Sequence, residues 1–141
     1  MNDEKMISSI VKTVQMGQFG IRCVQEKATD PQLKLALRDQ LKQYDTFEEK
    51  AYNLAQQKGW NITPLDPSIQ RMSAMMTRMR LIGGHANSKI AEMLVQGNTK
   101  GMIKSTRDLH RSGDCDPQLN ALAHNLIDSE RSNIRQASQF L

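Results

Sequence analysis

Apolar residues recur every three or four positions in four long stretches of this chain of 141 residues, and this spacing restricts the fold more than any other feature. It is the spacing of an α-helix that buries one face. Aromatic residues, which favour strands, make up only 4% of the sequence. In the first stretch the apolar face is formed by Met6, Ile7, Ile10, Val14, Ile21 and Val24. We therefore expect an all-α protein.

Turn and capping residues predict where each helix begins and ends. Thr29 or Asp30 is suited to cap a helix that begins at Pro31, and Gly59 is suited to end it. One domain spanning residues 1–141 is the size at which a single core forms. The expected helices lie at about 3–28, 31–58, 87–111 and 117–140, with a short extra helix at 67–82.

The string "DPQL" occurs twice, at residues 30–33 and 116–119, and each copy opens a helix that follows another helix. Two related helical hairpins would explain the repeat, and chance recurrence of four letters is the alternative. A long crossover that contains the methionine-rich residues 68–82 separates the two hairpins.

This order of hairpin, long crossover and hairpin resembles the ferritin-like four-helix bundle over nearly the whole chain. The segment "SKIAEMLVQGNTKGMI", residues 88–103, also resembles small, uncharacterised bacterial four-helix proteins related to that superfamily. The resemblance implies an antiparallel four-helix bundle of two helical hairpins joined by a long crossover that contains a short extra helix. In the superfamily, carboxylates and two Glu-x-x-His pairs hold two metal ions at the bundle centre.

The positions that would hold metal in this chain depart from the family pattern. Gln18 and Asn98 occupy places where the resemblance implies carboxylates, and the Glu-x-x-His pair of the last helix reads Glu130-x-x-Asn133. Neutral amides are poor ligands for iron, zinc or manganese. We therefore expect a degenerate metal site.

The second helix shows the same departure. Its matching place, 86 residues before Glu130, reads Tyr44-x-x-Phe47, although Glu48 also faces inward. The candidates for a remnant pocket are Gln18, Tyr44, Glu48, Asn98, Glu130 and Asn133. Because buried polar groups are ordinarily paired, a structural hydrogen-bond network is favoured over a pocket for a metal or small ligand.

Four glycines lie in the expected helices that carry this polar set. Each costs a helix interior about 1 kcal/mol relative to alanine. We expect that Gly17 and Gly20 on one helix and Gly97 and Gly101 on another let the two helices approach closely.

Methionines form a stripe in the short extra helix, at Met72, Met75, Met76 and Met79. Thioethers at this spacing could bind Cu(I), but packing in the core or against another subunit is the favoured interpretation. Three arginines surround the stripe and could contact an acidic partner or a membrane surface, although a solvated rim is favoured; they are Arg71, Arg78 and Arg80.

Four basic residues follow one another at helical spacing on the outer side of the expected third long helix: Lys100, Lys104, Arg107 and Arg111. They form a ridge suited to binding anions such as phosphates. The sequence contains no nucleic-acid-binding motif, so a nucleic-acid partner is possible but disfavoured.

Cys23 and Cys115 belong to no metal or redox motif, and no secretory leader is recognisable, so we expect a reduced, cytoplasmic protein. No apolar run is long enough for a transmembrane segment.

The favoured function is a structural or interaction role without catalysis, in a homo-oligomer with no cofactor. The alternative is a metal-binding or redox protein that uses Glu48, Glu130 and Tyr44 to hold iron or another transition metal. A further alternative is phosphate or nucleic-acid contact through the basic ridge.

Overall fold

The computed structural model describes residues 1–141 and contains helices but no strand, which confirms the expected all-α class. A short 3₁₀ turn, Gln25–Lys27, follows the first helix. The α-helices are α1 (Asp3–Val24), α2 (Pro31–Lys58), α3 (Pro67–Arg80), α4 (Ala86–Ser112) and α5 (Pro117–Ser138).

The two copies of "DPQL" have the same structural role. Asp30 accepts hydrogen bonds from the backbone amides of Gln32 and Leu33 at the start of α2. Asp116 caps α5 in the same way, through the amides two and three residues after it. In each copy the proline occupies the first turn, where its missing amide hydrogen costs nothing.

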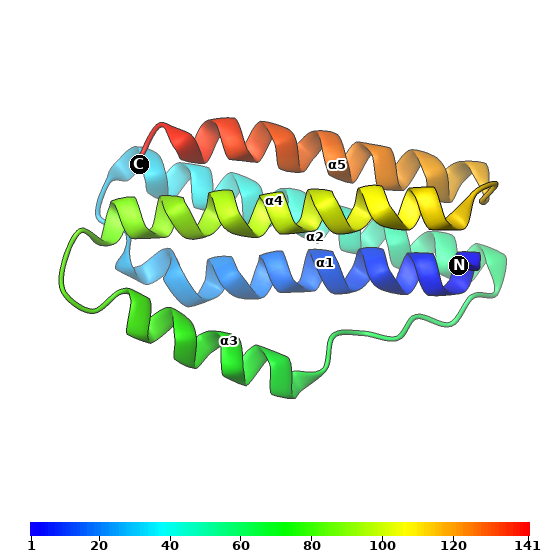
Figure 1. Ribbon diagram of the computed structural model, residues 1–141, viewed down its shortest axis with the longest axis horizontal. Helices are drawn as coiled ribbons and strands as arrows, with labels where there is room; N and C mark the ends of the chain where they lie inside the picture. Colours follow the sequence, from blue (N-terminus) through cyan, green and yellow to red (C-terminus); the bar gives the residue numbers. More distant parts are fainter.

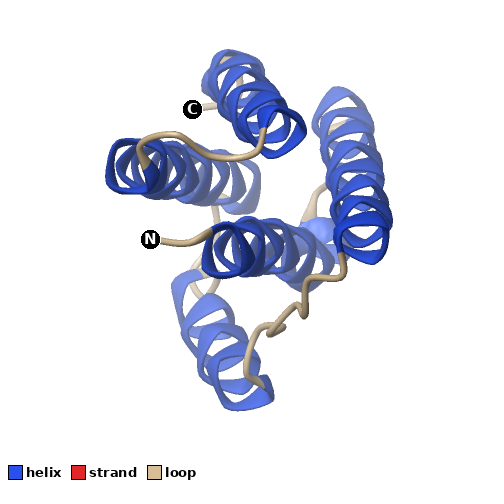
Figure 2. Cartoon of the chain, turned by 90° about the vertical axis from the view of Figure 1, so that its right-hand side faces the viewer, coloured by secondary structure: helices blue, strands red, loops and turns tan.

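Four long helices lie side by side, and each runs antiparallel to its two neighbours (Figure 1). The end-on view in Figure 2 shows that α1 lies beside α2 and α4, while α5 completes the group opposite α1. The segment that joins α2 to α4 returns along the outside of the molecule, and α3, which belongs to it, lies against α1.

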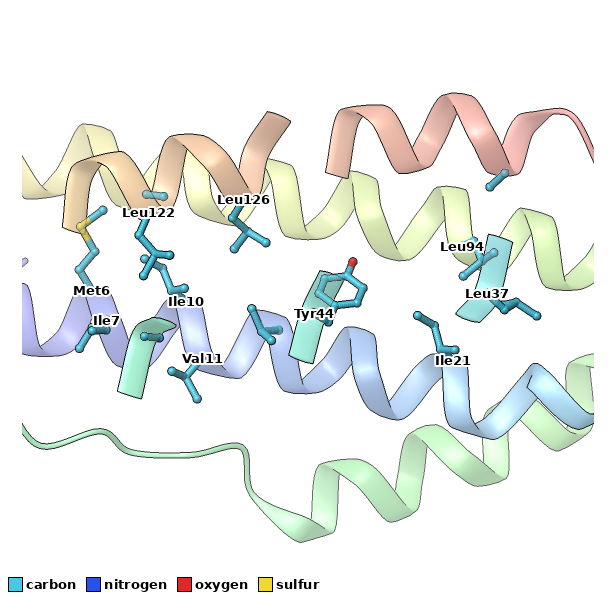
Figure 3. Packing of buried hydrophobic residues seen from close by; sticks show 14 of the residues in the cluster. Met6, Ile7, Ile10, Val11, Ile21, Leu37, Tyr44, Leu94, Leu122 and Leu126 are labelled. Atoms are coloured by element: carbon cyan, nitrogen blue, oxygen red, sulfur yellow. The ribbon is translucent and has the colours of Figure 1, made fainter. Parts of the chain in front are cut away.

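The core fills the space between these four helices. Figure 3 shows Ile10, Ile21 and Leu37 among the side chains that point into it. Tyr44 lies in the middle of the same cluster, with its hydroxyl directed towards α4. The apolar core therefore has a polar group at its centre.

The methionine stripe of α3 lies on the outside of the molecule, so the expectation that it fills the core of this chain is wrong. Met72, Met75, Met76 and Met79 are between 51% and 67% exposed. The only buried residue of α3 is Thr77, and it lies on the side of the helix opposite the stripe. Periodicity reveals an apolar face but cannot tell whether that face points to the core or to solvent.

None of the helices combines the length with the apolar character that crossing a membrane requires.

Candidate functional site

A hydrogen-bonded network of amides and a phenol lies at the centre of the four long helices. The Tyr44 hydroxyl donates to Oδ1 of Asn98 over 2.8 Å, and Nδ2 of Asn133 donates to the same oxygen over 3.2 Å. Asn98 in turn donates to the backbone oxygen of Leu94 at 2.8 Å. All three side chains are buried, as their positions on the helical faces predicted.

Gln40 extends this network and was missed in the sequence. Its side chain is fully buried, accepts from Asn98 Nδ2 at 3.4 Å and donates to Gln136 Oε1 at 3.0 Å. The sequence did indicate that Gln40 would be buried, because it lies one helical turn before Tyr44 on the apolar face of α2.

Gln18 and Glu48 form a second polar group, between α1 and α2. Gln18 Nε2 donates to Asp45 Oδ1 at 2.8 Å and to Glu48 Oε1 at 3.3 Å, while Gln15 donates to the other oxygen of Glu48 at 3.0 Å. No hydrogen bond joins this group to the Asn98 network. The six residues singled out from the sequence therefore do not form one connected site.

Glu130 belongs to neither group. Its side chain has no exposed surface, and neither carboxylate oxygen has a hydrogen-bond partner in the protein. Burial raises the pKa of Glu130 from its ordinary 4.5 to about 8, and the positive charge of Lys104 opposes part of that rise. Burial and the nearby charge of Glu130 also raise the pKa of Tyr44. The centre of the molecule thus holds a carboxyl group that is mostly protonated at neutral pH.

Two of the four helical glycines make room for these central side chains. A Cβ atom built on Gly17 would lie 2.5 Å from the Tyr44 ring carbon Cζ, and one built on Gly101 would lie 2.9 Å from Cδ of Glu130. Both distances are shorter than any relaxed carbon contact. Any larger residue at these two positions would displace a buried side chain.

The other two glycines face open space. Because Gly17 makes room for Tyr44 of α2 and Gly101 makes room for Glu130 of α5, the expectation that the four glycines let α1 and α4 approach closely is wrong. A Cβ atom on Gly20 or Gly97 would meet nothing within 4 Å. Both glycines line a cavity between α1 and α4. Their missing side chains leave room beside the backbone instead of admitting another helix.

The cavity has a volume of about 450 Å³ and an almost entirely apolar lining. Leu65, just before α3, and Ile69, in the first turn of α3, also line it, and Tyr44 and Glu130 reach it from α2 and α5. This volume lies within the roughly 300–1,000 Å³ typical of small-molecule sites. Glu130 is therefore a buried, unpaired polar group in the wall of an apolar pocket.

The two ends of the pocket differ in character. Ile21 and Met93 line one end, where the last turns of α1 lie beside the first turns of α4. Because the two helices are antiparallel, the opposite end is lined by Lys12 of α1 and by Lys100 and Lys104 of α4. The pocket thus has an apolar end and a basic end.

The basic ridge on α4 is exposed, and none of its four members has a carboxylate within ion-pair distance. Lys104 is also part of the pocket, and its ammonium group donates to the backbone oxygen of Ser9 at 3.3 Å. The Ser9 hydroxyl donates to the buried carboxylate of Asp108. Partial burial lowers the pKa of Lys104, Asp108 opposes this, and the positive charge of Lys12 lowers it further.

The cysteines and histidines lie outside this pocket. Burial raises the pKa of the Cys23 thiol, which makes it less reactive. His124 is exposed. No three side chains of His, Cys, Asp or Glu lie close enough together to hold a metal ion.

Comparison of the chain with protein-family models, with curated proteins and with solved structures found no match.

Proposed function

We propose that this chain is a ferritin-like four-helix protein without catalytic activity, which binds a small, largely apolar molecule between α1 and α4. The order of hairpin, crossover and hairpin supports the ferritin-like architecture, as does the antiparallel arrangement of the four long helices. In this proposal the Tyr44, Asn98 and Asn133 network takes the place of a di-metal site.

The observation that carries the proposal is the apolar pocket with the unpaired carboxyl of Glu130 in its wall. An unsatisfied buried polar group costs about 1–3 kcal/mol. If the Glu130 side chain turns towards the pocket, a bound molecule that offers a hydrogen-bond partner would remove this cost. The molecule would also fill the space beside Gly20 and Gly97. A purely structural bundle would gain stability from larger side chains at these two positions, and the sequence has glycine at both.

Calorimetric titration of the purified protein with 1-decanol tests this proposal. Decanol carries an apolar chain and an uncharged hydroxyl, so it probes the pocket without testing any charge preference. We expect saturable binding of one molecule per chain and a rise in the melting temperature. Absence of saturable binding up to the solubility limit of decanol would contradict the proposal.

The alternative is a metal or redox site that uses Glu48, Glu130 and Tyr44. Glu130 and Tyr44 lie near each other at the centre, whereas Glu48 is hydrogen-bonded to Gln15 and Gln18. Anaerobic titration with Fe(II), followed by metal analysis after desalting, separates the two functions. We expect far less than one iron per chain. Stoichiometric iron that Glu130→Gln abolishes would favour the metal site instead.

We also propose that the exposed methionine face of α3 is the contact for self-association. Met72, Met75 and Met79 share this face with Ile82, which is 74% exposed. Clustered apolar side chains on a surface commonly mark an interface. Sedimentation equilibrium should show an oligomer that dissociates when Met72, Met75 and Met79 are changed to glutamine. A wild-type chain that remains monomeric at high concentration would refute this.

A further inference from the structure

We propose that the natural occupant of the pocket is a single-chain amphiphile with a carboxylate head, of the fatty-acid type, whose head lies between Lys12, Lys104 and Glu130. This inference rests on the proposed small-molecule function and adds the chemical class of the ligand. The apolar tail then extends along α1 and α4 towards Ile21 and Val24.

The charge of the pocket favours an anionic head. Lys12, Lys100 and Lys104 all line it, and none has an acidic partner within 4 Å. Lys12 and Lys104 also line a shallower hollow together, and the charge of Lys12 lowers the pKa of Lys104, so the two ammonium groups repel each other. An anion between them would replace this repulsion with charge-assisted hydrogen bonds.

Glu130 also favours a ligand with an anionic head. A buried carboxyl that keeps its proton is a hydrogen-bond donor, and a carboxylate is a strong acceptor for it. A cationic head would gain a charge pair only if Glu130 ionised in an apolar setting, and it would also lie beside lysines of its own charge. The protonated Glu130 carboxyl and the lysines therefore both favour a carboxylate head.

The apolar part of the pocket matches the tail. From Lys12 to Val24 the wall formed by α1 rises by about 18 Å, which is long enough for an extended ten-carbon chain. Gly20 leaves the backbone of α1 uncovered along this wall, whereas the Tyr44 ring fills the space beside Gly17. A linear chain is suited to such a groove.

The titratable groups that face Glu130 across the pocket are few. They are Lys12 from α1, Tyr44 from α2, and Lys100 and Lys104 from α4. The segment before α3 contributes Leu65, α3 contributes Ile69, and α5 contributes no titratable group to the lining besides Glu130 itself. As pH rises, ionisation of Glu130 near pH 8 and loss of the proton from Lys104, whose pKa is lowered by burial, should both weaken binding of an anionic head.

The test compares three ligands that share one chain and differ in the head: decanoate, 1-decanol and decylamine. At pH near 7 we expect decanoate to bind about tenfold more tightly than decanol, since hydrogen bonds to a charged group are stronger than those between neutral groups. Decylamine should bind the most weakly. Lys12→Met and Lys104→Met should each weaken decanoate binding about tenfold and should affect decanol binding much less, because decanol carries no charge. Lys50→Met, an exposed change on α2 outside the pocket, is the matched control.

The second arm of the test is pH. Decanoate should bind wild-type protein more weakly as pH rises through about 8, because Glu130 then becomes negative. Glu130→Gln keeps a donor that cannot ionise, so its decanoate affinity should fall less over the same range.

Tighter binding of decylamine than of decanoate would overturn the proposed ligand class. Equal binding of decanoate and decanol, with no effect of either lysine change, would overturn it as well, while leaving the apolar pocket intact. If none of the three ligands binds, the proposed function fails together with this inference.

Discussion

Glu130 places an ionisable group where the protein offers it no hydrogen bond. Both of its oxygens are enclosed, and the Asn98 network beside it is satisfied without it. The folded protein avoids the cost of a buried charge by keeping the proton. Folding and proton binding are therefore linked at this residue.

The linkage predicts that Glu130 lowers stability as pH rises. Between about 4.5 and 8 the folded chain holds the proton and the unfolded chain has released it, so the free energy of unfolding falls by up to about 1.4 kcal/mol per pH unit. Glu130→Gln should therefore be more stable than wild type at pH 8 and gain little at pH 4.5. Urea unfolding at both values measures this. An equal difference at the two pH values would show that Glu130 is ionised in the folded protein.

The Tyr44 hydroxyl makes a smaller contribution. Tyr44→Phe removes the donor to Asn98 Oδ1, but that oxygen keeps its bond from Asn133. We expect a loss of about 1 kcal/mol in the free energy of unfolding, within the range for one hydrogen bond. Asn133→Leu in the Tyr44→Phe background should cost more than the sum of the two single changes, because Asn98 then loses both donors. Additive costs would argue against a shared network.

At the scale of the helices, both hairpins pair a glycine on the first helix with a large side chain on the second. In the first, Gly17 of α1 makes room for Tyr44 of α2, and in the second, Gly101 of α4 makes room for Glu130 of α5. Tyr44 and Glu130 are also the two residues related by the offset between the "DPQL" copies. A shared origin of the hairpins would explain this correspondence.

A double-mutant cycle tests the second of these pairs. Gly101→Ala should fail to give the stability gain of about 1 kcal/mol that helix propensity predicts, because the new methyl group overlaps the end of the Glu130 side chain, which must then move. In the Glu130→Ala background the same change should stabilise the protein. Failure to gain stability in that background as well would show that Gly101 is needed for another reason.

Much of the fold could be predicted from the sequence, because apolar periodicity and caps such as Asp30 and Asp116 are local signals. The burial of Asn98, Glu130 and Asn133 followed from their helical faces. Two features could not be predicted. A glycine does not reveal whether its missing side chain admits a neighbour, as at Gly101, or leaves a void, as at Gly97. The separation of Glu48 from Glu130 depends on side-chain geometry that spacing does not encode.

At the scale of the whole molecule, the pocket lies between α1 and α4, and side chains from α2, α5 and the segment that joins α2 to α4 also line it. Helices with larger side chains at positions 20 and 97 could fill this space. The chain instead gives up helix propensity at both positions. The pocket is therefore a property of how the helices are assembled and not of any one helix.

Gly97→Leu provides the most direct measurement of whether the glycines keep a binding pocket open. Leucine is the better helix former by nearly 1 kcal/mol, and at this position it enters empty space, so the variant should be at least as stable as wild type. It should also bind decanol at least about tenfold more weakly, because the new side chain occupies the pocket. Gln96→Leu, at the exposed neighbouring position outside the pocket, should leave decanol binding unchanged. A stable Gly97→Leu protein that binds decanol as tightly as wild type would contradict the proposed pocket.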